Sequence, residues 1–285
     1  MSGFFHGVTV TNVDTGARNV ALPSSSIIGL VDTFTEGAGA TAKAGDLVLI
    51  TNEREAVAAF GAASAITKAC QAIYTRSKAV IVATGVAKVV DPAAQTSGII
   101  GGVQASGKRT GLQALLDGKS RFNAQPRLIV APKHSATQAV ATAMQSIAEK
   151  LRAVAIIDGP GTTDEAATTY AKSFGSKRLY MVDPGVQLWD TTTSATIDAP
   201  ASAWAAGVFA YTDSEYGFWS SPSNKEFVGI TGTTRAIEYL DGDETCRANL
   251  LNNANIATII RDDGFRLWGN RTLSSDSKWA FVTRV

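Results

Sequence analysis

In the middle of the chain, short apolar runs alternate with longer amphipathic segments. The apolar runs are RLIVAP (127–132), AVAIIDG (153–159) and RLYMVDPG (178–185), and helical periodicity fills 135–152 and 162–175. Ser135 and Thr163 are candidate helix N-caps, and Gly175 is a candidate residue just past a helix end. Strands that alternate with helices at this spacing predict right-handed crossovers and a parallel sheet covered on both faces.

The flanking segments add further strands and helices. Before the middle part we expect strands at 25–34, 46–51 and 79–86, a helix over 64–77 and another opening at Asp91-Pro92. After it we expect a hairpin or loop over 186–200, a helix opened by Pro200, strands in 226–230 and 235–240, a helix over 243–254 and a hairpin over 256–269 that turns at Asp263-Gly264. The predicted fold class is therefore α/β, mixed α+β in the last third, with a layered body around a parallel sheet.

Composition narrows the possible functions. Among 285 residues, 45% are hydrophobic and 18% charged, with a net charge of +1 and no Lys/Arg run longer than two residues. These values give no electrostatic reason to expect nucleic acid or an anionic membrane as partner. The two cysteines exclude a disulfide framework, and Cys70 has the helical spacing of a buried residue. No apolar run is long enough to span a bilayer and the N-terminus lacks a secretory pattern, so we expect a soluble protein made in the cytoplasm.

Candidate catalytic groups are few. His6 and His134 are the only histidines, and His134 follows a predicted strand at the carboxyl edge of the sheet, where open α/β proteins bind ligands. No Gly-x-Ser-x-Gly motif accompanies it. The turn that begins at Asp158 contains glycines, but it lacks the Lys-Ser/Thr of a P-loop, and Asp164 and Glu165 would repel a phosphate there. A soluble α/β enzyme or nucleotide-binding protein with a site near His134 and Asp158 remains the alternative.

Other polar and glycine clusters have structural explanations. Asp241, Asp243 and Glu244 lack the spacing of an EF-hand and are better explained as acidic residues that open a helix. The glycines of 98–102 are expected to permit close packing or a turn. The sequence therefore predicts no catalytic residue, no metal site and no cofactor.

Three segments together resemble the tail sheath proteins of contractile bacteriophage tails and R-type pyocins. They are 216–232 (YGFWSSPSNKEFVGITG), 250–285 (which contains FRLWGNRT) and, more weakly, 98–135. The residues that carry the signature are Tyr216, Phe218, Trp219, Pro222, Asn224, Trp268, Asn270 and Arg271. The three aromatic residues at its start are expected to form a buried, packed cluster that anchors the turn at 222–224.

The resemblance implies a structural subunit rather than an enzyme. Such subunits stack in helically arranged rings around a tail tube, and the sheath contracts to drive the tube through a bacterial envelope. The implied partners are other copies of the subunit, the tail tube protein, and baseplate and tail terminator proteins, with no nucleic acid, membrane anchor or cofactor. The implied location is the host bacterial cytoplasm, followed by assembly into a phage tail or tailocin. A non-contractile virion or secretion component of related fold is a further alternative.

The resemblance also suggests a division of the chain. Residues 1–22 would form an N-terminal arm that adds a strand to a neighbouring subunit, with Val8, Val10 and Val13 setting its register. The alternative is an ordinary terminal strand in the sheet of its own chain. Residues 23–240 would form the α/β body, and 241–285 the beginning of an inner domain that faces the tube. Because members of the family continue past the strand pattern at 279–285, we expect this chain to be a truncated, monomeric fragment that does not polymerise.

Overall fold

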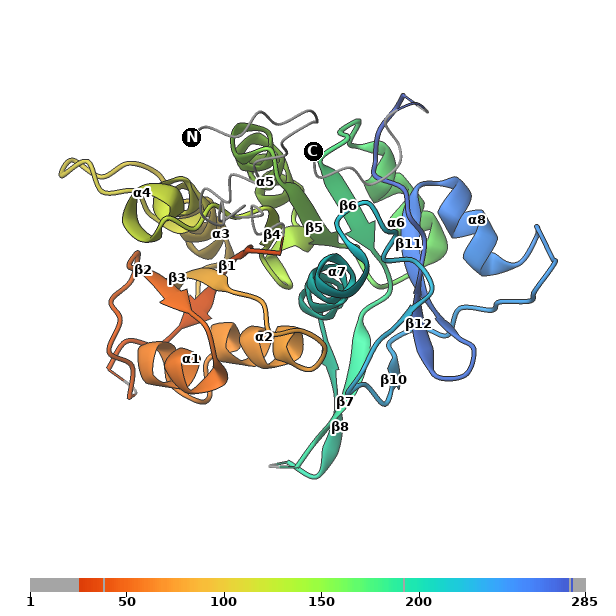
Figure 1. Ribbon diagram of the computed structural model, residues 1–285, viewed down its shortest axis with the longest axis horizontal. Helices are drawn as coiled ribbons and strands as arrows, with labels where there is room; N and C mark the ends of the chain where they lie inside the picture. The colour runs from red at the N-terminus through yellow and green to blue at the C-terminus, as the bar shows by residue number, and fades with distance from the viewer. Residues whose placement is uncertain (1–25, 38, 192, 277, 279–285) are drawn as a thin grey trace, which may run out of the picture.

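The structure is a computed structural model that describes residues 26–278 except 38, 192 and 277. Its main feature is a nine-stranded sheet of order β2-β3-β1-β4-β5-β6-β11-β12-β9, accompanied by a three-stranded sheet of order β10-β7-β8 (Figure 1). This large sheet, together with the helices that pack on it, confirms the predicted α/β class.

The strands and helices have the following bounds. The strands are β1 (Ile28–Phe34), β2 (Leu47–Ile50), β3 (Ile81–Ala87), β4 (Leu128–Val130), β5 (Val154–Asp158), β6 (Leu179–Val182), β7 (Val186–Asp190), β8 (Ala195–Ala199), β9 (Lys225–Glu226), β10 (Gly232–Thr233), β11 (Ile256–Arg261) and β12 (Phe265–Trp268). The helices are α1 (Glu53–Phe60), α2 (Ala65–Tyr74), α3 (Pro92–Ile100), α4 (Gly118–Phe122), α5 (Gln138–Leu151), α6 (Asp164–Lys172), α7 (Ser202–Tyr216) and α8 (Arg247–Asn253), with 3-10 helices η1 (Gly111–Asp117) and η2 (His134–Ala136).

The centre of the large sheet is parallel and its two edges are antiparallel. β3, β1, β4, β5, β6 and β11 run in one direction, so that Ile28 lies opposite Ile81 on one side and Leu128 on the other. β2 and the β12–β9 pair run antiparallel to their neighbours. The connections between parallel strands are crossover helices, and these helices cover both faces of a parallel sheet.

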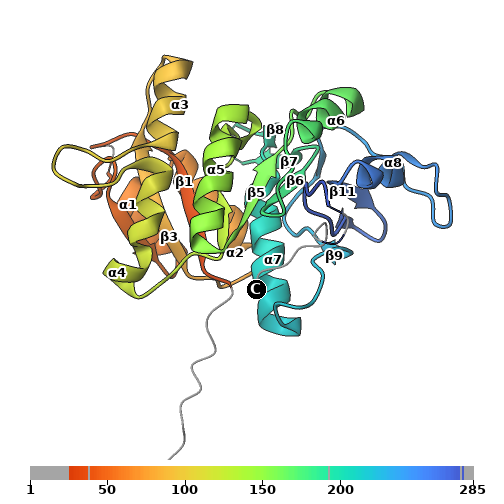
Figure 2. The same cartoon turned by 90° about the horizontal axis from the view of Figure 1, so that it is seen from above.

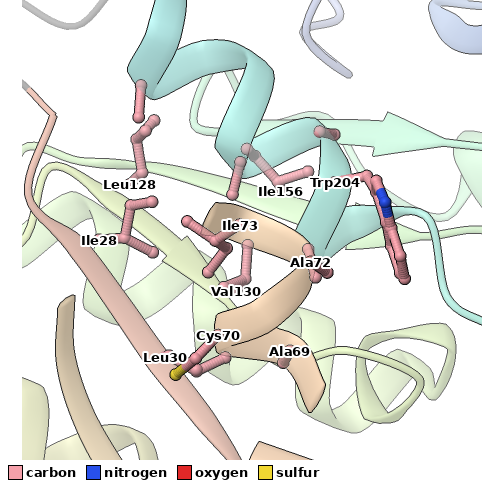
Figure 3. Close-up of a cluster of buried hydrophobic side chains, with 14 of the residues drawn as sticks. Ile28, Leu30, Ala69, Cys70, Ala72, Ile73, Leu128, Val130, Ile156 and Trp204 are labelled. Carbon is pink, nitrogen blue, oxygen red and sulfur yellow. The ribbon is translucent and has the colours of Figure 1, made fainter. Parts of the chain in front are cut away.

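Helices cover both faces of this sheet. α1, α2 and α7 pack on one face, where Ile28, Leu30 and Val130 point, while α5, α6, α8 and η1 pack on the other, where Val31 and Ile129 point. Figure 3 shows the first of these cores, with α2 and α7 side chains meeting those of β1, β4 and β5. The alternation of successive residues between two cores is the two-residue period of a strand buried on both faces.

α7 lies at the centre of the first core and is buried on nearly all sides. Its residues from Ser202 to Ala210 are all buried, which explains why its sequence is apolar without a polar face. It contacts α2 closely at Gly207, where an added Cβ would lie 2.8 Å from the carbonyl oxygen of Ile73. No helix in the part of the chain that the structure describes is long and apolar enough to cross a bilayer.

Most predicted elements are confirmed, and the glycines of 98–102 form the expected turn. Gly101 has φ 67°, and a Cβ there would lie 1.9 Å from the carbonyl oxygen of Thr110. Asp91 caps α3 by accepting hydrogen bonds from the backbone of Ala93 and Ala94, as its position before proline predicts. The hairpins at 186–200 and 256–269 are present as β7–β8 and β11–β12.

Four local predictions are wrong. α5 has its N-cap at Thr137 rather than Ser135, because the hydroxyl of Ser135 is bonded to another group. α6 ends at Lys172 with its C-cap at Ser173, so Gly175 is not the residue just past its end, although Thr163 is its N-cap as predicted. The segment 235–240 is not a strand, and 226–230 contributes only the end of β9. The helix expected over 243–254 begins only at Arg247.

The large sheet also crosses the predicted domain boundary at residue 241. β11 pairs with β6 in parallel, and β12 pairs with β9. Residues 256–268 are therefore hydrogen-bonded to the sheet of the α/β body, although the predicted boundary assigned them to the inner domain.

Candidate functional site

The predicted site near His134 and Asp158 is a buried junction of three elements. Asp158 ends β5, and its carboxylate accepts hydrogen bonds from the backbone N–H of Lys133 (3.0 Å) and the hydroxyls of Ser135 (3.0 Å) and Ser202 (2.7 Å). The backbone N–H of Ser202 donates a fourth bond of 2.8 Å. The junction thus joins β5 to the turn after β4 and to the start of α7.

This junction lacks the arrangement of a nucleophilic catalyst. Ser135 and Ser202 are both fully buried, and both hydroxyls donate to Asp158 rather than to a histidine. His134 instead places Nε2 3.3 Å from Oδ1 of Asp32. Burial raises the pKa of Asp158, while the hydrogen bonds from Ser202 and Ser135 oppose that rise. Since both oxygens of the carboxylate accept hydrogen bonds from protein donors, the carboxylate has a structural role.

The glycine turn after β5 is already filled by a carboxylate of the protein. Asp183 accepts a 2.7 Å hydrogen bond from the backbone N–H of Gly161, and its Oδ2 would lie 2.4 Å from a Cβ at Gly159. Arg235 donates to the other oxygen of Asp183 at 2.5 Å. The space in which a phosphate would lie against this turn is occupied, which agrees with the structural interpretation of the motif.

Arg235 also belongs to a chain of charges that joins the body to the segment before α8. Its guanidinium lies 2.9 Å from Asp164, which in turn accepts a 2.9 Å hydrogen bond from Nε of Arg247. Hydrogen bonding from Arg247 and the nearby charge of Arg235 hold the pKa of Asp164 below its usual range. Burial raises the pKa of Asp183, against the opposing charge of Arg235. Sequence reasoning missed this network because its members lie up to 83 residues apart.

The acidic group near α8 does not form a metal site. Asp243 accepts hydrogen bonds from the backbone (2.8 Å) and the hydroxyl (2.7 Å) of Thr245, which makes a local turn. Within the described ranges, no three His, Cys, Asp or Glu side chains gather as metal ligands. Asp241 and Glu244 are exposed.

The two segments that carry the family signature lie side by side. Lys225 in β9 pairs with Leu267 in β12, and the backbone N–H of Asn224 donates to the carbonyl of Leu267 at 2.6 Å. Asn224 adopts the left-handed conformation with φ 60°, which an asparagine tolerates better than most residues. Ser223 accepts a 3.1 Å hydrogen bond from the N–H of Gly269. The signature is therefore one structural unit, although its halves are separate in the sequence.

The remaining signature residues lie around this unit. Pro222 is buried, Trp268 and Asn270 are half-buried, and Arg271 is exposed. A groove of about 560 Å³ opens here, lined by Ser223, Glu244, Asn249, Leu250, Asn252, Asn253, Trp268, Gly269, Asn270 and Arg271. A smaller hollow of about 250 Å³ lies at the end of β1 between Phe34, Phe60 and Lys88. Neither hollow is lined by His134 or Asp158.

The prediction that the three signature aromatics are buried is wrong. Tyr216, Phe218 and Trp219 are 49%, 42% and 78% exposed. They do contact other rings, since Phe218 and Trp219 meet edge-to-face at 5.1 Å and Tyr216 lies 6.2 Å from Tyr211. The reason for their exposure is that α7 ends at Tyr216 and the chain turns outward at Gly217, past the last buried position of the helix. Val8, Val10 and Val13 lie outside the described residues.

Comparisons with known proteins agree on one family. Residues 107–273 match the family model of the phage tail sheath protein central domain, and residues 25–86 match that of the tail sheath protein Gp18 domain III N-terminal region. The chain is 74% identical over 282 residues to a putative prophage major tail sheath protein of Pseudomonas aeruginosa (strain UCBPP-PA14), a match that covers 99% of this chain and 73% of the relative. It is 35% identical over 288 residues to the tail sheath protein of Escherichia phage P2, covering 99% of this chain and 72% of that protein.

Solved structures show the same fold at lower identity. The helical sheath of the anti-feeding prophage in its contracted state matches with a TM-score of 0.63 and 19% identity, covering 96% of this chain and 72% of that one. The sheath complex of an extracellular contractile injection system, PVC, in its contracted state matches with a TM-score of 0.61 and 17% identity, covering 99% and 70%.

Proposed function

Because this chain belongs to the phage tail sheath family, we propose that it is a structural subunit of a contractile tail sheath. Copies of it assemble as helically stacked rings around a tail tube, and the sheath contracts to drive the tube through a bacterial envelope. The observation that carries this proposal is the 74% identity over 282 residues with a putative prophage major tail sheath protein. The identity extends over nearly the whole chain and is not confined to one motif.

The architecture suits a subunit that moves as a block. One continuous sheet joins β2 to β9, and buried side chains fill both of its faces. Close-packed interiors have low compressibility and transmit force instead of deforming. Contraction is then a rigid-body reorientation of subunits, with the energy released through changing contacts between them.

The partners follow from the same proposal. The solved relatives are described as a helical sheath and as part of a baseplate, so other copies of the subunit and baseplate proteins are the first partners expected here. A tail tube protein and a tail terminator complete the set. The subunit is made in the cytoplasm of a host bacterium and is assembled there into a phage tail or tailocin.

Two predicted regions remain part of this proposal. An N-terminal arm over residues 1–22 adds a strand to a neighbour, with Val8, Val10 and Val13 in its alternating pattern. The region 241–285 contributes to an inner, tube-facing domain. The pairing of β11 with β6 makes the first part of that region integral to the body's sheet.

The enzyme alternative lacks support in the described residues. Asp158 accepts four hydrogen bonds from protein donors, and Ser135 and Ser202 are buried. The glycine turn contains the carboxylate of Asp183 in place of a ligand. We therefore propose a protein without catalytic activity or cofactor.

A chimeric sheath tests this function directly. The matched region of the Pseudomonas aeruginosa sheath protein is replaced by this chain, and particles are examined by negative-stain electron microscopy. We expect tails enclosed by a sheath, some of them contracted. Bare tubes, from cells in which the chimera is abundant and folded, would contradict the proposal. The unaltered relative, expressed from the same plasmid, is the positive control.

A further inference from the structure

Five cationic side chains gather where three neighbouring strands of the large sheet begin. Because β4, β5 and β6 are parallel, the residues that precede them share the amino edge of the sheet. Across the segments 125–127, 149–152 and 176–178 the single carboxylate is that of Glu149, which leaves a net charge of +4, five cations less one carboxylate. We call these five side chains the basic rim: Arg127, Lys150, Arg152, Lys177 and Arg178.

Backbone pairing brings the members of the basic rim together. The N–H of Val154 donates to the carbonyl of Arg127 at 2.9 Å, and the N–H of Ala155 donates to the carbonyl of Arg178 at 2.8 Å. Arg127 and Arg178 therefore lie on either side of β5, about 10 Å apart at the usual strand spacing. The guanidinium of Arg127 also donates a 3.1 Å hydrogen bond to the carbonyl of Leu151, beside Arg152.

The basic rim carries more positive charge than its surroundings balance. Nη1 of Arg178 is buried and has no hydrogen-bond partner among the described residues. Burial lowers the pKa of Arg178, and the nearby charges of Arg152 and Arg127 lower it further, while the charge of Glu149 opposes them. Like charges that are held together repel one another, so the basic rim fits an anionic partner.

The chain itself contains a matching anionic surface. Since 26 Lys and Arg are balanced by 25 Asp and Glu, a surplus of cations at one edge requires a surplus of carboxylates elsewhere. Segment 238–244, which we call the acidic loop, contains Glu238, Asp241, Asp243 and Glu244 and no Lys or Arg. Of these, Asp243 is half-buried and the other three are exposed.

The acidic loop lies at the opposite edge of the sheet from the basic rim. Arg235, before the loop, pairs with Asp183 and Asp164, and Arg247, after it, pairs with Asp164. Asp164 follows β5 and Asp183 follows β6, so the loop is anchored at the carboxyl edge. Figure 2 shows the chain before α8 projecting at one end of the molecule, away from α5. The two charged surfaces of one chain therefore do not meet.

We propose that the basic rim of one copy of this chain binds the acidic loop of a second copy. Charge complementarity identifies the partner, since the loop offers four carboxylates to a rim with a surplus of four cations. Because the two surfaces differ and lie at opposite edges, the contact is heterologous and repeats along an open array. The inference rests on the proposed sheath function in naming a second copy as the partner.

Carbodiimide cross-linking, which joins a lysine amine to a carboxylate that touches it, tests this contact on the purified chain. Unlabelled and ¹⁵N-labelled chains are mixed, cross-linked and digested, and links of mixed isotope composition are those between copies. We expect such links from Lys150 and Lys177 to residues 241–244. Their yield should fall about tenfold when the salt is raised from about 0.01 M to about 1 M, because the Debye length falls from about 30 Å to about 3 Å. No mixed-isotope links at low salt would overturn the proposal.

A variant of the rim with a matched control checks that the contact depends on these charges. K150E/R152E reverses two charges of the rim and keeps Lys177 as the reporter, and we expect links from Lys177 to the acidic loop to fall about tenfold. The control R54E/K68E makes the same change in net charge at exposed positions of α1 and α2 and should keep the yield within about twofold. Equal yields from the two variants would count against the contact.

A charge swap keeps the proposal testable when single variants lose the links. D241K/D243K/E244K reverses the acidic loop and should not form the links alone. Mixed with K150E/R152E, its loop again faces a rim of opposite charge, so we expect links between the introduced glutamates and the introduced lysines. A mixture without them, from variants whose circular dichroism matches that of the wild type, would refute the pairing of rim and loop.

The outcomes separate this contact from the proposed function. If the chimera forms sheaths but the chain shows no such links, the contact is overturned and the function stands; links without sheaths would have the reverse meaning. Binding of a short oligonucleotide that K150E/R152E abolishes, with no links between copies, would assign the basic rim to nucleic acid and overturn the proposal.

Discussion

Replacing Asp158 by alanine should destabilise the fold more than replacing an exposed aspartate. The carboxylate accepts four hydrogen bonds, from the backbone of Lys133 and Ser202 and from the hydroxyls of Ser135 and Ser202. The hydroxyls can rotate toward other acceptors, but the two backbone N–H groups cannot. Each buried donor left without a partner costs about 1–3 kcal/mol, so we expect a total loss of about 3–5 kcal/mol.

An asparagine at the same position separates charge from shape. Asp158→Asn keeps one oxygen but places an amide NH₂ against a donor, so at least one backbone N–H of the junction loses its acceptor. We expect a loss of about 1–3 kcal/mol, between wild type and Asp158→Ala. An exposed control is Asp198→Ala on β8, whose carboxylate accepts a 3.1 Å hydrogen bond from the side chain of Gln187; its change should stay within about 0.5 kcal/mol.

Guanidinium chloride denaturation at pH 7, followed by circular dichroism, measures these free energies of unfolding. The midpoint should fall in the order wild type, Asp158→Asn, Asp158→Ala, with an unchanged slope. If Asp158→Ala and Asp198→Ala unfolded at the same midpoint, the junction would not hold α7 to the sheet, and the structural role assigned to Asp158 would be refuted.

Three further predictions concern the charge network and the backbone. Arg235→Leu leaves Asp183 buried without its counter-charge and should lower the free energy of unfolding by about 3 kcal/mol. Adding Asp183→Asn to this variant should restore part of that loss. If urea denaturation showed that the effects of the two single substitutions simply add in the double variant, the pairing would be contradicted. Gly101→Ala should lower the free energy of unfolding by about 3 kcal/mol or prevent folding, because the φ of Gly101 is positive and backbone atoms lie where the Cβ would be. Gly102 has open space at its Cβ position, so Gly102→Ala should change that free energy by no more than about 1 kcal/mol. Equal melting temperatures of the two variants would contradict this prediction. The pKa of Asp164 is lowered in the folded protein, so its charge stabilises the fold fully above the ordinary value of 3.8, and this stability is lost as the pH falls below 3.8 through the lowered pKa. Wild type and Asp164→Asn should therefore differ in urea midpoint at pH 7, and the difference should shrink as the pH is lowered below 3.8; a constant difference would contradict the ion pairing.

The local patterns predicted the central part of the fold well. Runs such as 153–159 are apolar throughout because both faces of their strand are buried, and this pattern is visible without tertiary information. Thr163 and Asp91 cap helices through bonds to residues two or three positions away, so the sequence contains both partners. The turn at Asp263-Gly264 is equally local.

Long-range partners explain the predictions that were wrong. Serine is a common N-cap residue, but the hydroxyl of Ser135 donates its hydrogen bond to Asp158, 23 residues away. The segment 235–240 has the residues of a strand, yet Arg235 turns toward Asp183 and Asp164 and the backbone finds no strand partner there. Competition of this kind is decided by tertiary contacts and is absent from a single-sequence pattern.

In the candidate site, too, the local motifs were predictable from the sequence and the long-range contacts were not. The motif around 222–224 and that around Trp268 were both recognised, but their pairing through β9 and β12 is a tertiary fact. The exposure of Trp219 could not be predicted either, because it depends on the tertiary neighbours past the end of α7, which the local sequence does not contain. The ion pairs of Arg235 gave no signal, since isolated charges in a loop are normally solvated.

Cryo-electron microscopy of the chimeric tails, in extended and contracted states, tests the central claim most directly. We predict that copies of this chain form the wall around the tube in both states. The nine-stranded sheet should superpose within about 1 Å between the states while the subunits rotate relative to the tube. A wall that lacks this chain, or subunits in which β11 separates from β6 on contraction, would contradict the account.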